Sequence, residues 1–261
     1  MTLFFSIQSY GQFLWKSKNQ HGVHSPFVFD LVTKCFYDKT SKPEYLQLKK
    51  YRNELLQNKS SIEVTDFGAG SRVFKSNKRP ISKIAQTAGI SPKRAELLFR
   101  IVNYFQPDSM LEIGTSLGLA TSALSRGNPK ATITTLEGCP ETAKIAQKQF
   151  EKFQLKNILL QTTEFSTYLK NRQPTTNNRQ LIYFDGNHSK AATLQYFELL
   201  LPTITNETVW IFDDIHWSTA MTEAWETIKK HPKVKVTIDT FQWGLVFFRS
   251  EQEKEHFVIR V

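Results

Sequence analysis

Apolar runs of strand length alternate with longer amphipathic segments from residue 108 onward. This alternation is typical of a parallel sheet whose strands are joined by helical crossovers. It predicts seven strands: Ser109–Ile113, Thr132–Leu136, Ile158–Gln161, Gln180–Asp185, Thr208–Asp213, Val234–Asp239 and Gly244–Arg249. Helices are expected between the strands, at Ser116–Ser125, Glu141–Phe153, Glu164–Lys170, Lys190–Leu200 and Ser218–Lys230. Since only Thr240 to Trp243 separate the last two strands, these strands are expected to pair antiparallel.

The predicted fold class is therefore α/β, with five parallel units and a terminal antiparallel hairpin, flanked by helices. The first 107 residues differ from this pattern and are expected to be mainly helical. Ser25-Pro26 and Ser91-Pro92 each place a capping residue before a proline suited to the first helical turn, and Pro43–Gln57 is rich in helix formers. We therefore expect a helical N-terminal extension over residues 1–107 and an α/β domain over residues 108–261.

Charge is distributed unevenly between these two parts. The chain holds 34 Lys and Arg against 24 Asp and Glu, a formal net charge of +10, and the excess lies in residues 1–100, with 17 basic against 7 acidic residues. Such asymmetry indicates either a partner that is anionic, such as nucleic acid, an acidic membrane surface or an acidic small molecule, or a basic solvated surface.

The cysteine content and the first residues of the chain indicate in which cellular compartment the protein is expected. Two cysteines, Cys35 and Cys139, are too few for a disulfide framework or a four-thiolate metal site, so a reduced, cytoplasmic protein is expected. The apolar opening of the chain lacks a basic leader and is soon interrupted by polar residues, so neither a signal peptide nor a membrane span is expected.

The sharpest local motif is a glycine turn that follows the first predicted strand, within Leu111–Gly118. Glycines such as Gly114 and Gly118 let the backbone approach a ligand closely, and the helix that follows offers free N–H groups to a carboxylate or phosphate. The same turn would also serve as a tight strand-to-helix connection without a ligand. Glu137 ends the neighbouring strand, 23 positions after Gly114. A carboxylate there can accept both hydroxyls of a ribose, as in Rossmann-like nucleotide sites, or it can cap the following helix.

Three acidic residues follow the fourth and fifth predicted strands. Asp185 ends the fourth, and Asp213 and Asp214 end the fifth. If these strands are neighbours, the carboxylates converge at one sheet edge, and their repulsion requires a cation or raised pKa values. Mg²⁺ suits such oxygen ligands. The alternative is that Asp185 only begins a turn while Asp213 and Asp214 cap and solvate a loop.

From residue 109 to its end, the sequence resembles the class I S-adenosylmethionine-dependent methyltransferases. Its glycine-turn motif and the motif that ends at Gly138 are most similar to those of the catechol-type and natural-product O-methyltransferases. The resemblance implies a Rossmann-like fold and S-adenosylmethionine as cofactor. It places the methionine part of the cofactor at the first turn and its ribose at Glu137. The residues expected at the methionine part are Glu112, Gly114, Ser116 and Gly118, and Thr115 is a further expected cofactor-binding residue.

The same resemblance implies metal ligands at Asp185, Asp213 and Asp214. It places His188, three residues after Asp185, where the catechol-type pattern has a lysine as general base; His188 or Asp185 would take the proton of a substrate hydroxyl held by the metal. Two positions depart from the pattern, with Ala120 in place of a serine and Asp214 in place of an asparagine. The expected function is O-methylation of a small-molecule hydroxyl, assisted by Mg²⁺, and dimers are common among such enzymes.

Other functions fit parts of the sequence. A nicotinamide enzyme is disfavoured because Ser116 replaces the second glycine of its fingerprint, and the glycine-containing segment Asp66–Ser71 is followed by basic residues rather than by a helix. An RNA methyltransferase would use the basic N-terminal segment to hold phosphates. A non-catalytic binding protein could keep the same fold. The basic loop from Arg72 to Lys83 is expected to close over the pocket and to select an acidic acceptor.

Overall fold

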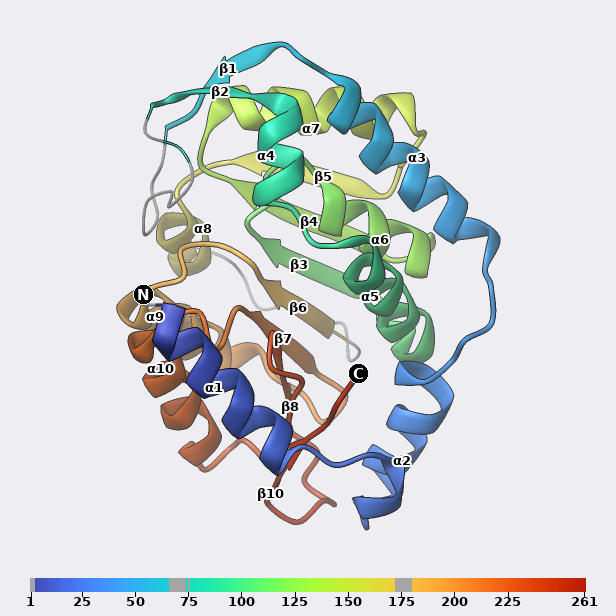
Figure 1. Cartoon of the computed structure of the whole chain (residues 1–261), viewed down its shortest axis with the longest axis vertical. Helices are drawn as coiled ribbons and strands as arrows, with labels where there is room; N and C mark the ends of the chain where they lie inside the picture. Colours follow the sequence, from blue (N-terminus) through green and yellow to red (C-terminus); the bar gives the residue numbers. More distant parts are fainter. Residues whose placement is uncertain (1–2, 66–73, 75, 172–179) are drawn as a thin grey trace.

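A twisted eight-stranded sheet forms the centre of the protein. The computed structural model describes residues 3–65, 74, 76–171 and 180–261. The strand order is β10-β8-β9-β7-β6-β3-β4-β5 (Figure 1). The strands are β3 (Ser109–Ile113), β4 (Thr132–Glu137), β5 (Ile158–Thr162), β6 (Gln180–Phe184), β7 (Val209–Asp213), β8 (Val236–Asp239), β9 (Trp243–Phe247) and β10 (Glu255–Val258).

The pairing confirms the predicted α/β class. Strands β5, β4, β3, β6 and β7 are parallel, and β9 lies antiparallel between β7 and β8. The prediction of seven strands was short by one, because β10 adds to the edge of the sheet, parallel to β8. In Glu255–Val258 only Phe257 is buried, so the segment lacks the apolar run that marks the other strands.

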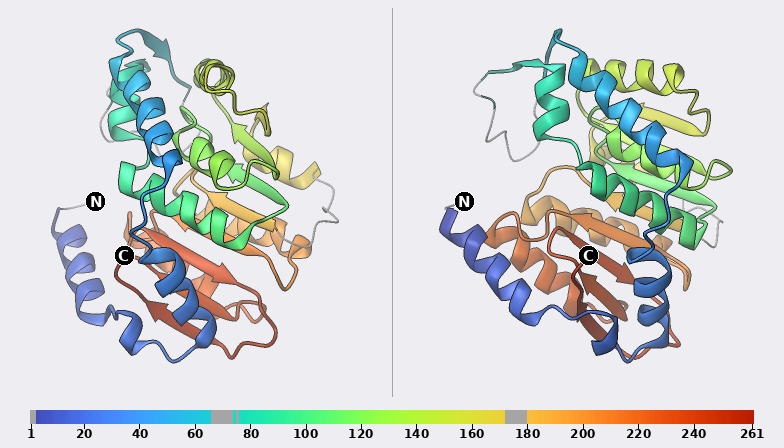
Figure 2. Two further views of the ribbon diagram at one scale, coloured as in Figure 1. Left: turned by 90° about the vertical axis from the view of Figure 1, so that its right-hand side faces the viewer. Right: turned by 45° about the vertical axis from the view of Figure 1, so that its right-hand side comes forward.

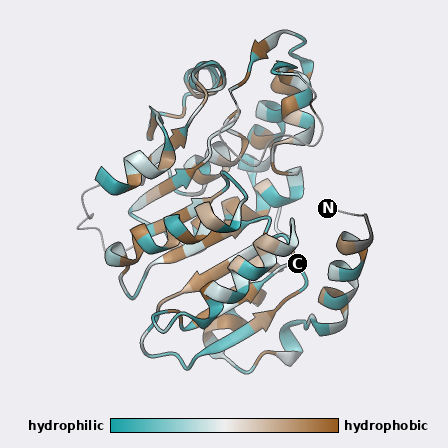
Figure 3. Ribbon diagram, turned by 90° about the vertical axis from the view of Figure 1, so that its left-hand side faces the viewer, coloured by the Kyte–Doolittle hydropathy of each residue, from teal (hydrophilic) through white to brown (hydrophobic). Residues whose placement is uncertain are grey.

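Helices cover both faces of this sheet. One face carries α3 (Pro43–Gln57), α5 (Pro92–Phe105), α6 (Leu119–Gly127) and α7 (Pro140–Lys152), and the other carries α8 (Phe165–Asn171), α9 (Lys190–Leu200) and α10 (Thr219–Lys230) (Figure 2). Each face has its own core, which includes Leu98 and Phe150 on the first and Phe197 and Trp225 on the second. Between the two cores the strands are largely hydrophobic (Figure 3).

The N-terminal segment is mainly helical, as predicted. It also includes α1 (Leu3–Lys16), α2 (Pro26–Leu31), a π-helical turn (Val32–Phe36), α4 (Ile81–Thr87) and two short strands that pair with each other, β1 (Ser61–Glu63) and β2 (Lys78–Pro80). Ser25 and Ser91 cap their helices as predicted, through side chains that accept the N–H of Val28 and Arg94.

This segment wraps around the α/β part rather than standing apart from it. Its Tyr51 and Leu98 belong to the same core as strand residues of the sheet. Lys18, just after α1, pairs with Ile259 near the other end of the chain. None of the described helices is both long enough and apolar enough to cross a membrane.

Candidate functional site

The candidate site lies at the carboxyl ends of β3 and β6, where the strand order reverses. From β3 the chain crosses to β4 on one side, whereas β6 lies on the other. In open α/β sheets this switch point is where ligands bind, because the loops that leave the two strands diverge there. Gly114 and Thr115 donate backbone N–H groups to the carbonyl of Leu136 at the end of β4, which fixes the turn after β3.

Glycine is required at both ends of this turn. Gly114 has φ of +106°, and a Cβ at this position would lie 2.5 Å from the carbonyl oxygen of Asp185. Gly118 has φ of +77° and precedes α6, and a Cβ there would lie 2.4 Å from the Phe150 ring. The Tyr51 hydroxyl in α3 donates to the Leu117 carbonyl at 2.9 Å. The turn is therefore packed closely between the end of β6 and helices α3 and α7.

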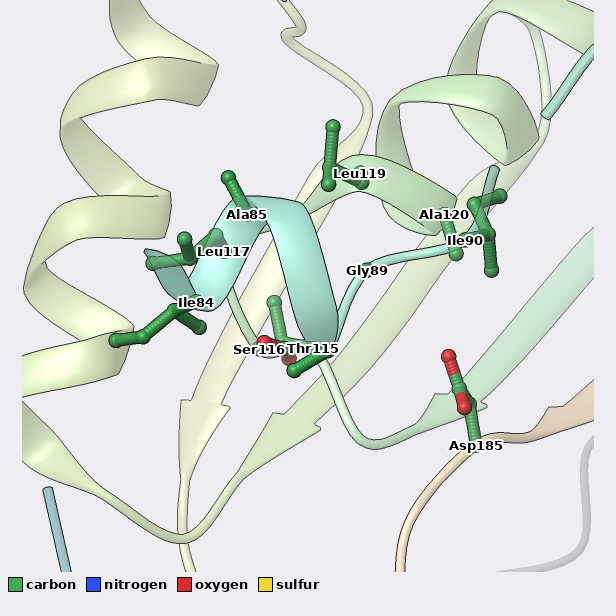
Figure 4. A pocket seen from close by; sticks show the side chains of 11 residues that line it. Ile84, Ala85, Gly89, Ile90, Thr115, Ser116, Leu117, Leu119, Ala120 and Asp185 are labelled. Atoms are coloured by element: carbon green, nitrogen blue, oxygen red, sulfur yellow. The ribbon is translucent and has the colours of Figure 1, made fainter. Parts of the chain in front are cut away.

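A pocket opens over this turn. The turn and the start of α6 form its floor, α4 and the loop after it form one wall, and Asp185 lies at one side (Figure 4). Its lining residues are Ile84, Ala85, Ala88, Gly89, Ile90, Thr115, Ser116, Leu117, Leu119, Ala120 and Asp185. The N-terminal segment thus completes a pocket whose floor comes from the α/β part.

Glu137 lies beside this turn, at the carboxyl end of β4. Its Oε2 accepts the backbone N–H of Ser116 at 2.7 Å, and its Oε1 accepts that of Cys139 at 2.9 Å. Both carboxylate oxygens of Glu137 therefore accept backbone N–H groups at this edge of the sheet. The turn and the acidic residue, which the sequence predicts as one unit, are joined by a hydrogen bond.

Glu112 is a fully buried residue of the predicted cofactor set. Its side chain is fully buried, and its Oε2 accepts hydrogen bonds from the Thr121 and Thr135 hydroxyls, both at 2.5 Å. Thr135 also pairs with Thr115 at 2.6 Å. Glu112 therefore supports the turn from the side away from the pocket. Of the predicted cofactor residues, Thr115 and Ser116 line the pocket, whereas Glu112, Gly114, Gly118 and Glu137 are not among its lining residues.

Burial raises the pKa of Glu112 to about 8, although the two threonine hydrogen bonds act in the opposite direction. The folded state therefore holds this proton more tightly than the unfolded chain does. The resulting stabilisation is complete below the ordinary pKa near 4.5 and is lost as the pH rises through about 8.

We expect the neutral variant Glu112→Gln to remove this pH dependence. Near pH 5 its free energy of unfolding should be close to that of the wild type, whereas near pH 9 it should be higher by roughly 3–5 kcal/mol. Denaturant unfolding at both pH values measures the difference. Glu141→Gln, on the surface of α7, is the control; equal pH dependence in wild type and Glu112→Gln would show that Glu112 is not the titrating group.

The predicted carboxylates of the next two strands do meet at this edge, because β6 and β7 are neighbours. Asp185 and Asp213 have side chains that are 18% and 5% exposed. Burial and the adjacent charge of Asp213 raise the pKa of Asp185 well above its ordinary value. His188 Nε2 lies 3.7 Å from Asp185 Oδ1. Asp214 has φ of +53° and donates its backbone N–H to Asp213 Oδ1 at 2.8 Å.

Arg94 supplies a positive charge that the sequence analysis missed. It lies in the first turn of α5, and its Nη2 is paired with Asp213 Oδ1. Its guanidinium lies 5.0 Å from the centre of the Trp243 ring. Burial alone would lower the pKa of Arg94, but the charge of Asp213 raises it above its ordinary value. Its position in the sequence could have predicted this role. Arg94 falls on the apolar stripe of α5 with Leu98 and Ile101, and a charge on a buried stripe needs a partner.

As arranged, these side chains do not fit the predicted Mg²⁺ site. Asp213 accepts hydrogen bonds from Arg94 and the Asp214 N–H on Oδ1, and from the Tyr183 hydroxyl at 3.2 Å on Oδ2. Within the described ranges, no three His, Cys, Asp or Glu side chains are grouped so that they could hold a metal ion. Converging carboxylates require a cation or a raised pKa. Here Arg94 supplies the cation, and the pKa of Asp185 is raised.

Other polar and aromatic residues near this sheet edge do not line the pocket, and part of the basic loop lies outside the described residues. His216 is paired with Asp239 at 2.8 Å. Tyr183 and Trp243 are core residues, and both also contact the Asp213–Arg94 pair. The glycine segment Asp66–Ser71 lies outside the described residues, as do Arg72 and Lys75 of the basic loop.

Comparison with known proteins gives one family match and a shared fold. Residues 111–215 match the family described as methyltransferase domain. No curated protein matches the chain. Among solved structures, the SAH-bound methyltransferase PaMTH1 of Podospora anserina has a TM-score of 0.60 at 14% identity, covering 87% of this chain and 97% of that one.

Two further structures share the fold. The O-methyltransferase of Bacillus cereus in complex with SAH has a TM-score of 0.54 at 18% identity, covering 81% of this chain and 94% of that one. The O-methyltransferase TomG of Streptomyces achromogenes, involved in tomaymycin synthesis and solved with SAM, has a TM-score of 0.55 at 13% identity, covering 83% and 94%.

Proposed function

We propose that this chain, which carries a methyltransferase domain over residues 111–215, transfers the methyl group of S-adenosylmethionine to a hydroxyl oxygen of a small molecule. The observation that carries this proposal is the joined unit at the switch point. There, Glu137 binds the Ser116 N–H of a glycine turn, and the turn forms the floor of a pocket. The three O-methyltransferase and methyltransferase structures, two solved with SAH and one with SAM, add support.

The residues present fit this cofactor. The turn from Gly114 to Gly118 brings backbone close to the pocket, where a Cβ at Gly114 would collide with the end of β6. Glu137 would accept the ribose hydroxyls, as charged acceptors do in related nucleotide sites. When bound, the cofactor supplies an electrophilic methyl group on a sulfonium.

Asp185 and His188 are the proposed proton acceptors for the substrate hydroxyl. Asp185 lines the pocket, and its raised pKa makes it a stronger base than an ordinary aspartate. His188 lies within 3.7 Å of it and can pass the proton toward the surface. Holding the hydroxyl oxygen here, in line with the methyl group that it attacks, would supply much of the rate acceleration.

Transfer of a labelled methyl group tests the proposal directly. Purified protein is incubated with methyl-labelled S-adenosylmethionine and panels of neutral and acidic hydroxyl compounds, with total RNA as a separate panel. We expect label on oxygen of a small molecule, and we expect His188→Ala to lower kcat by about 100-fold or more. His24→Ala, an exposed histidine outside the pocket, is the matched control.

Two results would contradict this proposal. Label found only in RNA would favour the alternative in which the basic N-terminal segment holds phosphates. Label on nitrogen of a small molecule, with His188→Ala fully active, would show that the acceptor atom is not oxygen and that His188 takes no part in proton transfer.

A further inference from the structure

The corner where β6 and β7 end and β9 begins contains the positive charge of Arg94. Asp213 ends β7, and Trp243 is its partner residue on β9 in the antiparallel pair. The guanidinium of Arg94 reaches both of them, pairing with the carboxylate of Asp213 and lying over the ring of Trp243. Because the two contacts come from neighbouring strands, they hold the guanidinium in a defined place.

The position of Arg94 is also fixed from its own helix. Its backbone N–H binds the side chain of Ser91, which caps α5. The side chain of Arg94 is only 19% exposed, and its Nε is buried with no hydrogen-bond partner among the described residues. A buried guanidinium with an unused donor is expensive to keep, so its charge must be offset by the neighbouring carboxylates.

We propose that Arg94 takes the place of a divalent metal ion in this protein. It is a positioning residue, since it acts through Asp213 and the charge of the corner rather than by contact with the methyl group. Two carboxylates and one guanidinium already occupy the corner, and three of the lone pairs of Asp213 accept protein hydrogen bonds. A divalent ion would have to displace the guanidinium or share the corner with a like charge.

This inference extends the proposed function to a metal-independent methyl transfer, but its core claim concerns the chain alone. If Arg94 stands in for the metal, Asp185 and Asp213 do not form a metal site while Arg94 holds Asp213. Removing the charge of Arg94 should let these two carboxylates rearrange around a hard divalent cation that keeps water as its other ligands. The claim can therefore be tested without an acceptor and without turnover.

Mn²⁺ titration followed by electron paramagnetic resonance provides the test. We expect no binding to the wild type below about millimolar Mn²⁺, and binding at least about tenfold tighter to Arg94→Gln. Arg94→Lys, which keeps the charge, should behave like the wild type. Lys93→Gln removes one positive charge from the exposed side of the same turn and should not create a site. Adding Asp213→Asn to Arg94→Gln should abolish the new binding.

Two results would overturn the inference. Tight Mn²⁺ binding to the wild type that Asp213→Asn removes would show that Arg94 and a metal coexist, and this result needs no Arg94 variant to fold. A folded Arg94→Gln protein without gained Mn²⁺ binding would show that Arg94 is not what keeps a metal out. Neither result bears on the cofactor, whose binding is measured separately with S-adenosylhomocysteine.

Discussion

Replacing Gly114 with alanine is expected to lower the free energy of unfolding by about 3–5 kcal/mol and to abolish cofactor binding. The added Cβ would lie 2.5 Å from the Asp185 carbonyl oxygen and 2.7 Å from its carbonyl carbon. Both are backbone atoms, so no side-chain rotation relieves the contact. A φ of +106° is also unfavourable for alanine. Denaturant unfolding and titration with S-adenosylhomocysteine measure the two effects.

Gly11→Ala provides the matched control for this prediction. Gly11 lies in the middle of α1, and a Cβ there would meet no atom within 4 Å. Alanine favours a helix interior over glycine, so this variant should be unchanged or more stable by up to about 1 kcal/mol. If Gly114→Ala unfolded like Gly11→Ala, the close contact between the turn and the end of β6 would be wrong.

Asp213→Ala is expected to be the most damaging substitution among the charged residues, costing about 3–5 kcal/mol of stability. It would leave the guanidinium of Arg94 buried without its partner and remove the acceptor of the Tyr183 hydroxyl. By contrast, Glu207→Ala breaks a surface pair with Arg249 and should cost at most about 1 kcal/mol.

A double-mutant cycle separates the pair from its surroundings. We expect Arg94→Met to suppress much of the cost of Asp213→Ala, because no buried guanidinium is then left without its carboxylate partner. The free energies of unfolding of the two single variants, the double variant and the wild type give the coupling. Costs that simply add would contradict a direct Arg94–Asp213 interaction.

Local patterns were enough to predict most of the sheet. Ser109–Ile113 and Gln180–Phe184 are buried on both faces, so their apolar runs are nearly continuous and stand out in the sequence. The edge strand β10 was not predicted because its first two residues, Glu255 and His256, are exposed. Its pairing with β8 depends on tertiary contacts, which short-range patterns do not contain.

The candidate site was predictable only where the sequence itself brings its parts together. The turn at Gly114 and the residue Glu137 belong to one strand–helix–strand unit, so their separation along the chain predicts that they lie close together. Arg94 and Asp213 are 119 positions apart, and no local pattern predicts that pair. Glu112 shows a related limit: strand alternation places it on one face of β3 with Met110, but only the structure shows that Thr121 and Thr135 enclose it there.

Calorimetric titration with S-adenosylhomocysteine tests the central claim most directly. We predict binding to the wild type with a Kd on the order of micromolar, and no binding of NAD under the same conditions. Glu137→Ala should weaken binding by about tenfold or more, because a charged acceptor for the ribose is lost, whereas Glu141→Gln should bind normally. Absence of S-adenosylhomocysteine binding to the folded wild type, or equal binding by Glu137→Ala, would contradict the account.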